Sequence, residues 1–594
     1  MGFVRISADS DPNENIFQDA ECEISDHPVD IEYIRRNIPC QWACPAITNV
    51  PKYIGAVSRN EHDESYTINQ NANLFPGVLG RICSRPCETA CRHGEIDLGD
   101  PVAICHLKRV ASDYKQSVLS PLTKNVPLTD KSIGIVGAGP AGLAAAHSLN
   151  LLGHRITIYE AFPESGGMLV YGIPKFRLPR EIAHREIYNI QNGGIDVRHG
   201  VEVGKDIMID ELLKHHDALI LAAGCYRARE LSVPGESKTH VYNGLEFMID
   251  LNNGKPVNVG QKVLVIGGGF TAMDCARSAI RLGASEVSIC IRNVEEDLTV
   301  TREEILETKR EGLKLISLVS AIEIEGNDKI TGVRFIRNKF GGIRGERGRR
   351  ITPIEGSEFV VPADTVIVAI GQVPKALLAE PTEFADIQFD KLTGESFIDG
   401  LFAAGDYVTG SSTVIEAIGH GRHVADHVDA FLMRHKRQQR VVTCKPTGNT
   451  QRDRSWDFID RHHMPMISTN ERIHSSDSEV ETGFTMNMGI EESKRCYLCN
   501  LKYEIYVPEC IYCRWCIDVC PRDCIELAES FKVAGNSGTH KINTTVKWNE
   551  VSAIIINNDR CIRCGECFRV CPTQCIHVID VNLMDKTLVK ELSE

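Results

Sequence analysis

The stretch "KSIGIVGAGPAGLAAAHSLNLLGHRITIYEA", residues 131–161, predicts a strand, a tight glycine turn, a helix and a second strand. The turn has the pattern G-x-G-x-x-G, with a proline at the start of the helix: Gly137, Gly139, Pro140 and Gly142. In this motif the glycines form the turn, let the backbone approach a pyrophosphate and pack the helix on the strand. Glu160 ends the second strand, where a carboxylate can bind ribose hydroxyls. We therefore expect a dinucleotide-binding Rossmann unit.

A second unit of the same kind occupies residues 262–293, "KVLVIGGGFTAMDCARSAIRLGASEVSICIRN". Gly267, Gly269 and Ala272 hold the fingerprint positions. Arg292 follows the second strand in place of an acidic residue, and an arginine there can accept a 2′-phosphate, which favours NADP(H). A solvated charge at the strand end is the alternative interpretation of Arg292.

A third apolar strand with a carboxylate at its end lies in "GLFAAGDYVTGSSTVIEAIGHGR", residues 400–422. Gly405 and Asp406 follow the strand, and a helix is predicted from Thr413 and Val414. This arrangement suits a carboxylate on a ribityl hydroxyl and a helix N-terminus facing a phosphate or a flavin oxygen. An ordinary turn followed by a helix cap is the alternative.

Composition limits the possible function classes. The chain has 594 residues, 42% hydrophobic and 25% charged, so several globular domains are expected. A net charge of −14 argues against a nucleic-acid or anionic-membrane binder. No apolar stretch reaches membrane-spanning length. The first residues lack the charged and then apolar pattern of a secretory signal peptide, so we expect a cytoplasmic protein. The 23 cysteines, clustered at C-x2-C and C-x3-C spacing, indicate metal ligands in a reducing compartment.

The C-terminal region contains the run C-x2-C-x2-C-x3-C-P twice, as "CIYCRWCIDVCP" and "CIRCGECFRVCP". In this run three thiolates bind one [4Fe–4S] cubane and the fourth crosses to the other. The two predicted clusters are therefore on Cys510, Cys513, Cys516 and Cys571, and on Cys561, Cys564, Cys567 and Cys520. Zinc is the alternative, although it prefers two separated pairs. Cys524 and Cys575 are expected to be buried apolar residues, and an inserted loop or hairpin is expected near residues 535–550.

These stretches together resemble a known family. "GAGPAGLAAA", "GGMLVYGIPKFRLP", "GGGFTAMD", "AIGQVP" and the stretch around Asp406 are similar to the small, FAD- and NAD(P)H-binding subunit of glutamate synthase. Similar proteins include the N-terminal half of dihydropyrimidine dehydrogenase and electron-bifurcating transhydrogenases. The resemblance implies FAD on the first fingerprint, with Gly167 and Asp406, and NAD(P)H on the second, in a domain inserted into the FAD domain. The family usually has a second arginine after Arg292, so Asn293 leaves the NADP preference open.

"NIPCQWACPAITNVPKYI" and "GRICSRPCETACRHGEIDLGDPVAICHLKR" resemble the family's helical N-terminal domain, which binds two [4Fe–4S] clusters. The family's leading C-x2-C is missing before Cys40, and "EESKRCYLC" at residues 491–499 has the character of that lead-in. We therefore expect residues 434–495 to run back across the protein and deliver this pair to the N-terminal domain. The family pattern then implies one cluster on Cys40, Cys91, Cys496 and Cys499, and another on Cys44, Cys83 and Cys87. Half a zinc hook or an unliganded pair is the alternative for Cys496 and Cys499.

One ligand of the second N-terminal cluster is missing, because the motif cysteines number fifteen, one fewer than four cubanes need. Relatives use a Glu or Gln that aligns with Lys108, and a protonated lysine has no lone pair to offer. Cys105 lies three residues earlier on the same helical face and is a candidate, with His106 behind it. A buried structural cysteine is the alternative.

The expected architecture is multidomain α/β. Its parts are a helical iron–sulfur domain (1–120), a Rossmann-like FAD domain in two parts (121–254 and 364–433), an inserted Rossmann-like NAD(P) domain (255–363), a connector (434–504) and a bacterial-type 2[4Fe–4S] ferredoxin domain (505–594).

The expected activity is that of an NAD(P)H:acceptor oxidoreductase, in which hydride passes from NAD(P)H to FAD and electrons leave singly through four [4Fe–4S] clusters, or the reverse. No side-chain acid or base is required, so no catalytic residue is named. The expected partner is a redox protein, and the NAD(P)H:acceptor oxidoreductase of dissimilatory sulfite reductase systems (the DsrL type) is similar in carrying a C-terminal ferredoxin. A homodimer is a further expectation that stays open. The alternatives are a wiring subunit with vestigial nucleotide sites and a zinc-binding scaffold.

Overall fold

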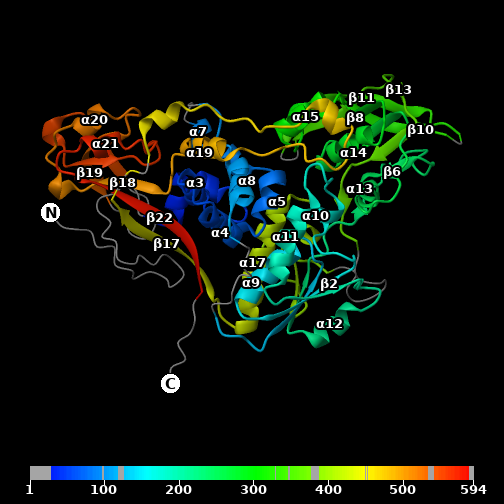
Figure 1. Cartoon of the computed structure of the whole chain (residues 1–594), viewed down its shortest axis with the longest axis horizontal. Helices are drawn as coiled ribbons and strands as arrows, with labels where there is room; N and C mark the ends of the chain where they lie inside the picture. Colours follow the sequence, from blue (N-terminus) through cyan, green and yellow to red (C-terminus); the bar gives the residue numbers. More distant parts are fainter. Residues whose placement is uncertain are drawn as a thin grey trace.

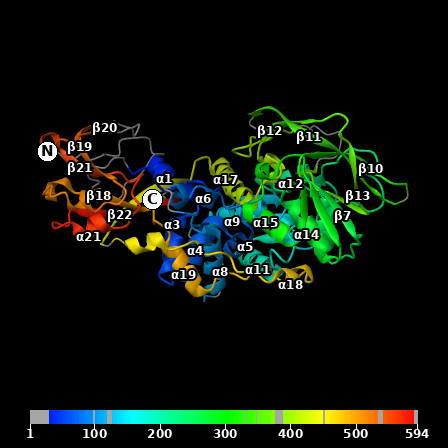
Figure 2. The ribbon, with the colours of Figure 1, turned by 90° about the horizontal axis from the view of Figure 1, so that it is seen from above.

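The computed structural model describes residues 29–587 apart from 96–98, 118–125, 328, 346–347, 376–386, 449, 451 and 533–540. The ferredoxin region lies at one end of the long axis and the NAD(P) unit at the other, with the N-terminal helices and the FAD unit between them (Figure 1). The view from above has the same order (Figure 2). The expected domain boundary at residue 120 lies outside the described residues. Among the described residues, no helix has the length and apolar character needed to cross a membrane.

Eight helices build the part of the N-terminal region that the structure describes. Polar caps start several of them: the Asp30 carboxylate accepts the N–H of Tyr33, and the Asn49 side chain accepts that of Lys52. The helices are α1 (Ile31–Asn37), α2 (Pro39–Trp42), α3 (Val50–Ser58), α4 (His62–Asn73), α5 (Pro76–Ile82), α6 (Pro86–Thr89), α7 (Arg92–Glu95) and α8 (Ile104–Tyr114).

The first fingerprint opens a parallel sheet with strand order β16-β4-β1-β2-β3. Its central strands are buried on both faces, as is typical of a parallel sheet covered by helices. The strands are β1 (Ser132–Val136), β2 (Arg155–Glu160), β3 (Asp196–His199), β4 (Ala218–Leu221) and β16 (Leu401–Ala403). The helices are α9 (Pro140–Leu151), α10 (Met168–Tyr171), α11 (Arg180–Gln191), α12 (Ile209–His215), α16 (Asp406–Thr409) and α17 (Val414–Met433).

The second fingerprint belongs to another parallel sheet, of order β6-β14-β7-β8-β9. Its strands are β6 (Val241–Asn243), β7 (Lys262–Ile266), β8 (Glu286–Cys290), β9 (Lys314–Ile316) and β14 (Thr365–Val368), and its helices are α13 (Gly244–Asn252), α14 (Phe270–Arg281) and α15 (Arg302–Arg310). Antiparallel strands follow: β10 (Val319–Glu325), β11 (Gly332–Gly345), β12 (Gly348–Pro353) and β13 (Phe359–Pro362). The pair β5 (Arg227–Ala228) and β15 (Gln372–Val373) flanks this unit. Strands β6 and β14 lie outside the interval 255–363 expected from sequence, because three- and four-residue strands carry too little periodicity to recognise.

The C-terminal region contains two three-stranded sheets, β17-β22-β18 and β20-β19-β21. Their strands are β17 (Gln438–Thr447), β18 (Leu501–Ile505), β19 (Ile525–Lys532), β20 (Lys541–Thr544), β21 (Ala553–Ile556) and β22 (Ile576–Thr587), with short helices α20 (Trp515–Asp518) and α21 (Glu566–Val570). β17 and β18 come from the expected connector, so that stretch also completes a sheet with β22. β19 and β20 form an antiparallel pair where a hairpin was expected, although residues 533–540 lie outside the described part.

Between β17 and β18 the chain crosses both nucleotide units before it returns to the N-terminal helices. Arg472 in α18 (Thr469–Ile473) contacts Glu307 of α15, and the Val480 N–H donates to the Phe176 carbonyl oxygen at 3.0 Å. The chain then enters α19 (Met486–Lys494), where a Cβ on Gly489 would lie 2.9 Å from Val110 of α8.

Two apolar cores contain the buried cysteines of the predicted N-terminal sets, and Cys87 lies in the first of them. One core joins the N-terminal helices to the ferredoxin region and contains Cys40, Cys499 and Cys561. The other joins the helices to the FAD sheet and contains Cys44 and Cys83. The N-terminal helices are therefore packed on both neighbours through apolar contact.

The buried contact of Arg472 should contribute strongly to stability. Its guanidinium lies 2.5 Å from the Glu307 carboxylate and 3.6 Å from that of Glu311, and all three side chains are buried. Arg472→Ala leaves buried carboxylates without this cation, so we expect a loss of about 3 kcal/mol in unfolding free energy by urea titration. Lys375→Ala, which removes an exposed partner of Glu202, is the control and should cost less than about 1 kcal/mol. Equal effects would contradict the prediction.

Candidate functional site

The first glycine turn lies between β1 and α9. Gly137 has φ +102°, and an added Cβ would lie 2.6 Å from the Ala222 carbonyl oxygen. On Gly142 an added Cβ would lie 2.0 Å from the Gly137 carbonyl oxygen. Gly139 differs, because among the described residues the atom nearest to its added Cβ is 3.9 Å away, in Gly167. The space beside Gly139 is therefore open to a ligand, as a pyrophosphate site needs.

Glu160 lies beneath this turn at the end of β2. Its two carboxylate oxygens accept the N–H groups of Ala138 at 2.7 Å and Phe162 at 2.8 Å. Burial raises the pKa of Glu160 above its usual value, although these backbone hydrogen bonds act in the opposite direction. An ionised carboxylate has about four acceptor sites, so about two are left for ribose hydroxyls. Glu160 therefore also holds the glycine turn, a role that the sequence did not predict.

Asp406 lies next to the first fingerprint. The preceding Gly405 has φ +65°, and an added Cβ would lie 2.5 Å from the Ala141 Cβ in α9. The Ser412 hydroxyl donates to the Asp406 carboxylate at 2.5 Å. Burial raises the pKa of Asp406, since it disfavours the charged form.

The N-terminus of α17 lies near Asp406. Thr413 caps the helix in a capping box with Glu416, and Val414 is the first helical residue. An added Cβ on Gly421 would lie 2.3 Å from the Ala141 carbonyl oxygen, so α17 packs closely on α9. Asp406 and α17 thus both lie beside the start of α9, which is the placement that the predicted phosphate and hydroxyl site requires.

The second fingerprint repeats the local geometry of the first. An added Cβ on Gly267 would lie 2.1 Å from the Ala369 carbonyl oxygen, and Ala272 is fully buried. No described atom lies within 4 Å of an added Cβ on Gly269, so the middle glycine of this second fingerprint also faces open space. Arg292 is exposed after β8, and Asn293 is partly buried beside it. An exposed arginine there is accessible to a phosphate.

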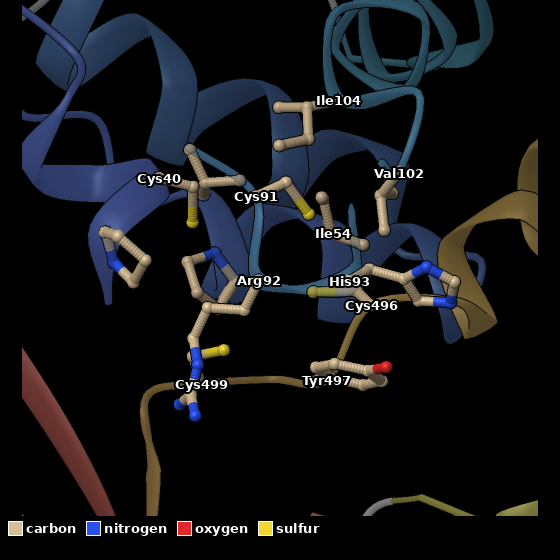
Figure 3. Close-up of a pocket in the computed structure, with 13 residues that line it drawn as sticks. Cys40, Ile54, Cys91, Arg92, His93, Val102, Ile104, Cys496, Tyr497 and Cys499 are labelled. Atoms are coloured by element: carbon tan, nitrogen blue, oxygen red, sulfur yellow. The ribbon is translucent and has the colours of Figure 1, made fainter. Parts of the chain in front are cut away.

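Four cysteines from three distant stretches surround one buried cavity (Figure 3). Cys40 comes from α2, Cys91 from the turn between α6 and α7, and Cys496 and Cys499 from the segment after α19. These are the four residues that the family pattern grouped. Arg92 and His93 complete one side of the cavity, and the His93 ring stacks on Tyr497 with centroids 5.1 Å apart.

The segment with Cys496 and Cys499 is fixed by buried polar contacts. Arg495 donates to the Asp100 carbonyl oxygen at 2.7 Å, to the Ile459 carbonyl oxygen at 2.9 Å and to the Glu492 carboxylate at 2.9 Å. Glu492 also accepts the N–H of Ala103 at 2.8 Å. These contacts join α19 to the chain entering α8.

The second N-terminal set consists of Cys44, Cys83 and Cys87, next to α8. Cys105 is within hydrogen-bonding reach of Cys83, and its thiol also donates to the Leu79 carbonyl oxygen at 3.1 Å. Burial acts to lower the pKa of Lys108, but the thiolates of all four cysteines outweigh it and the pKa is raised. The structure thus brings Cys105 and Lys108 to this set.

His106, the other candidate for the missing ligand, packs differently. Its ring is buried edge-on against Phe484, with centroids 5.2 Å apart. The structure therefore favours Cys105 over His106 as the neighbour of Cys83.

The ferredoxin cysteines also divide into two sets. Cys510, Cys513, Cys516 and Cys571 line one cavity, together with Ile511 and Arg514. In the other set, burial first and then the neighbouring Cys561 and Cys564 raise the pKa of Cys567, with smaller contributions from Cys516 of the first set and from Cys520. In the second set Cys561, Cys564 and Cys567 are buried and Cys520 is partly exposed, whereas in the first set Cys516 is buried and Cys510, Cys513 and Cys571 are partly exposed. The second set is therefore the inner one.

Cys524 and Cys575 are buried as expected, and each also touches a predicted ligand. The Cys524 sulfur lies 3.3 Å from that of Cys520, and the Cys575 sulfur 3.5 Å from that of Cys571. Both pairs have a four-residue spacing, a signal in the sequence that could have indicated the contact. Hydrogen bonds to ligand sulfurs affect the potentials of iron–sulfur clusters.

Two of the four-cysteine sets, the one with Cys40 and the one with Cys510, line a cavity instead of converging on one point. Among the described residues, no three His, Cys, Asp or Glu side chains lie close enough to bind a single metal ion. Thiolates around a cavity of this kind fit a [4Fe–4S] cluster held by cysteines.

Comparison with known proteins assigns the three regions separately. Residues 131–421 match the family described as pyridine nucleotide-disulphide oxidoreductase. Residues 31–119 match dihydropyrimidine dehydrogenase domain II, 4Fe-4S cluster, and residues 509–575 match the 4Fe-4S dicluster domain. The expected fold class is thereby confirmed.

The glutamate synthase [NADPH] small chain of Azospirillum brasilense is 35% identical over 422 residues, which cover 66% of this chain and 86% of that protein. The chain belongs to the glutamate synthase small-chain family. The NADPH-Fe(3+) oxidoreductase subunit beta of Geobacter sulfurreducens is 34% identical over 504 residues, 78% of this chain and 75% of the relative. The NADP(+)-dependent formate dehydrogenase subunit beta of Moorella thermoacetica is 33% identical over 508 residues, 78% and 70% of the two chains. The present protein, as a member of this family, is therefore an iron–sulfur flavoprotein oxidoreductase, as expected.

The position of Cys496 leads to a direct test. Cys496→Ala should remove one N-terminal cluster, about four irons per chain, because the other three thiolates of Figure 3 then lack a partner. Both ferredoxin clusters should remain, as judged by iron content and by EPR of the reduced protein. The control is Cys444→Ala, a buried cysteine outside every predicted set, which should leave the iron content unchanged. Loss of a ferredoxin cluster in Cys496→Ala would contradict the assignment.

Proposed function

We propose that this protein carries electrons between NADPH and a separate redox protein through one FAD and four [4Fe–4S] clusters. The observation that supports this most strongly is the order of the cysteine sets along the molecule. Cys44 and Cys83 share a core with the FAD sheet, whereas Cys87 of the same set lies with Cys40 and Cys499 in the core shared with the ferredoxin region. The set with Cys510, three of whose four cysteines are partly exposed, would then end this series next to solvent.

The flavin end of this series is in close contact with the first cysteine set. An added Cβ on Gly419 of α17 would lie 2.4 Å from the Pro45 carbonyl oxygen, one residue after Cys44. The N-terminal half of α17, which starts at the proposed FAD site, therefore packs directly on the loop that carries Cys44. This contact supports electron exchange between the flavin and the set of Cys44, Cys83 and Cys87.

The proposed roles of the residues are to bind, orient and exclude water. The first fingerprint, Glu160 and Asp406 would hold FAD, and the second fingerprint with Arg292 would hold NADPH. The flavin supplies the exchange between two-electron hydride chemistry and one-electron transfer when bound. Burial of the inner cysteines keeps water from the clusters, and the partly exposed set would face the partner.

A partner protein is proposed from the relatives and from the exposed end of the series. Two of the relatives carry the name of a beta subunit and one that of a small chain, so they are parts of larger assemblies. A sulfite reductase is one candidate for the partner of this chain.

Anaerobic addition of NADPH tests the proposal. The flavin absorbance should bleach and the iron–sulfur absorbance should then decrease, because electrons pass from NADPH to flavin and clusters. Arg292→Glu should raise the KM for NADPH about tenfold or more and affect NADH much less, since it places a negative charge beside a 2′-phosphate. Arg302→Glu, another exposed arginine of the same unit, is the control. Flavin that stays oxidised with NADPH would indicate a wiring subunit instead.

We further propose that Cys105 is the fourth ligand of the set with Cys83. Cys105→Ser should then weaken that cluster, seen as a loss of up to about four irons and of one EPR signal. Cys275→Ser, a buried cysteine of the NAD(P) unit, is the matched control. An unchanged iron content and spectrum in Cys105→Ser would reject Cys105 as a ligand.

A further inference from the structure

Arg563 lies at the junction between the N-terminal helices and the ferredoxin region. It stands between Cys561 and Cys564 in the second ferredoxin run, and its side chain is fully buried. Its backbone is in the left-handed region, with φ +55°, and its N–H donates to the Cys561 sulfur at 3.4 Å.

The Arg563 guanidinium bonds to backbone carbonyls on both sides of the junction. Its Nε donates to the Leu501 carbonyl oxygen at 3.1 Å, and one Nη donates to the Cys499 carbonyl oxygen at 3.5 Å. The other Nη donates to the carbonyl oxygen of Cys561. A single cation therefore contacts the backbone of one predicted ligand from each of two cluster sets.

The first ferredoxin run provides an internal comparison. The equivalent position there is Tyr512, which has almost the same backbone, with φ +54°. Its side chain is directed elsewhere, and its hydroxyl donates to the Ser552 carbonyl oxygen at 3.1 Å. The backbone turn thus belongs to the repeat, whereas the buried charge belongs to the inner set alone.

We propose that Arg563 is a positioning residue that places a permanent positive charge between the cluster of Cys499 and the cluster of Cys561 and raises the reduction potentials of both. This inference rests on the proposed function, because it takes Cys499 and Cys561 as ligands of two different clusters. Each cluster gains negative charge when reduced, and a nearby buried cation stabilises that form with little solvent screening. Arginine is charged at all relevant pH values, so the effect does not depend on pH.

The test uses the full-length holoprotein and EPR-monitored redox titration. Arg563→Gln should lower the reduced-to-oxidised ratio of both clusters at a fixed potential by about tenfold, which is ~59 mV for a one-electron couple. Arg563→Lys keeps the charge and should stay near the wild-type potentials. Arg560→Gln removes an exposed arginine one residue before Cys561 and should leave the potentials unchanged, because its charge is screened by water.

The outcomes are distinguishable. Unchanged potentials in Arg563→Gln, or an equal shift in Arg563→Lys, would overturn the role of the charge. Loss of iron from Arg563→Gln would make Arg563 a structural support only and would also overturn the proposal. A wild-type protein that lacks either of the two clusters would instead refute the proposed function on which the inference rests.

Discussion

The buried ion pair between Arg495 and Glu492 is the contact on which the organisation of the protein depends. Together these two side chains hold the backbone around Asp100 and Ala103 to the segment that carries Cys496 and Cys499. Both are fully buried, and buried charges are tolerated only when they are paired and hydrogen-bonded. The pair therefore specifies one docked position for a segment that comes almost four hundred residues later in the chain.

This docked segment makes the C-terminal region part of the central body. The chain passes directly from Cys499 into β18, which pairs with β22 of the ferredoxin region. Side chains of the N-terminal helices and of the ferredoxin region share one apolar core, so these two regions are packed as a unit. Electron transfer between them would then need no docking step, in contrast to transfer to a separate partner.

Much of the site could be predicted from sequence because its motifs are local. Gly137, Gly142 and Gly267 are required by backbone contacts within a few residues or within one sheet, and the two ferredoxin runs specify their ligands by spacing alone. The displaced pair Cys496 and Cys499 could be assigned to the N-terminal domain only through the family pattern. The joining of Glu160 to the glycine turn and the buried cation Arg563 could not be predicted, since each depends on contacts between elements.

The sequence by itself determined the fold class, the two nucleotide fingerprints and the grouping of the ferredoxin cysteines, because short-range spacing dictates backbone turns and ligand geometry. Tertiary structure alone decided where the inserted NAD(P) unit begins and ends, and that β17 and β18 complete a sheet with β22. It also decided which cysteine set packs against the first parallel sheet and which is mostly partly exposed. These features follow from burial of apolar surface and pairing of buried charges between distant segments, and no local pattern encodes such contacts.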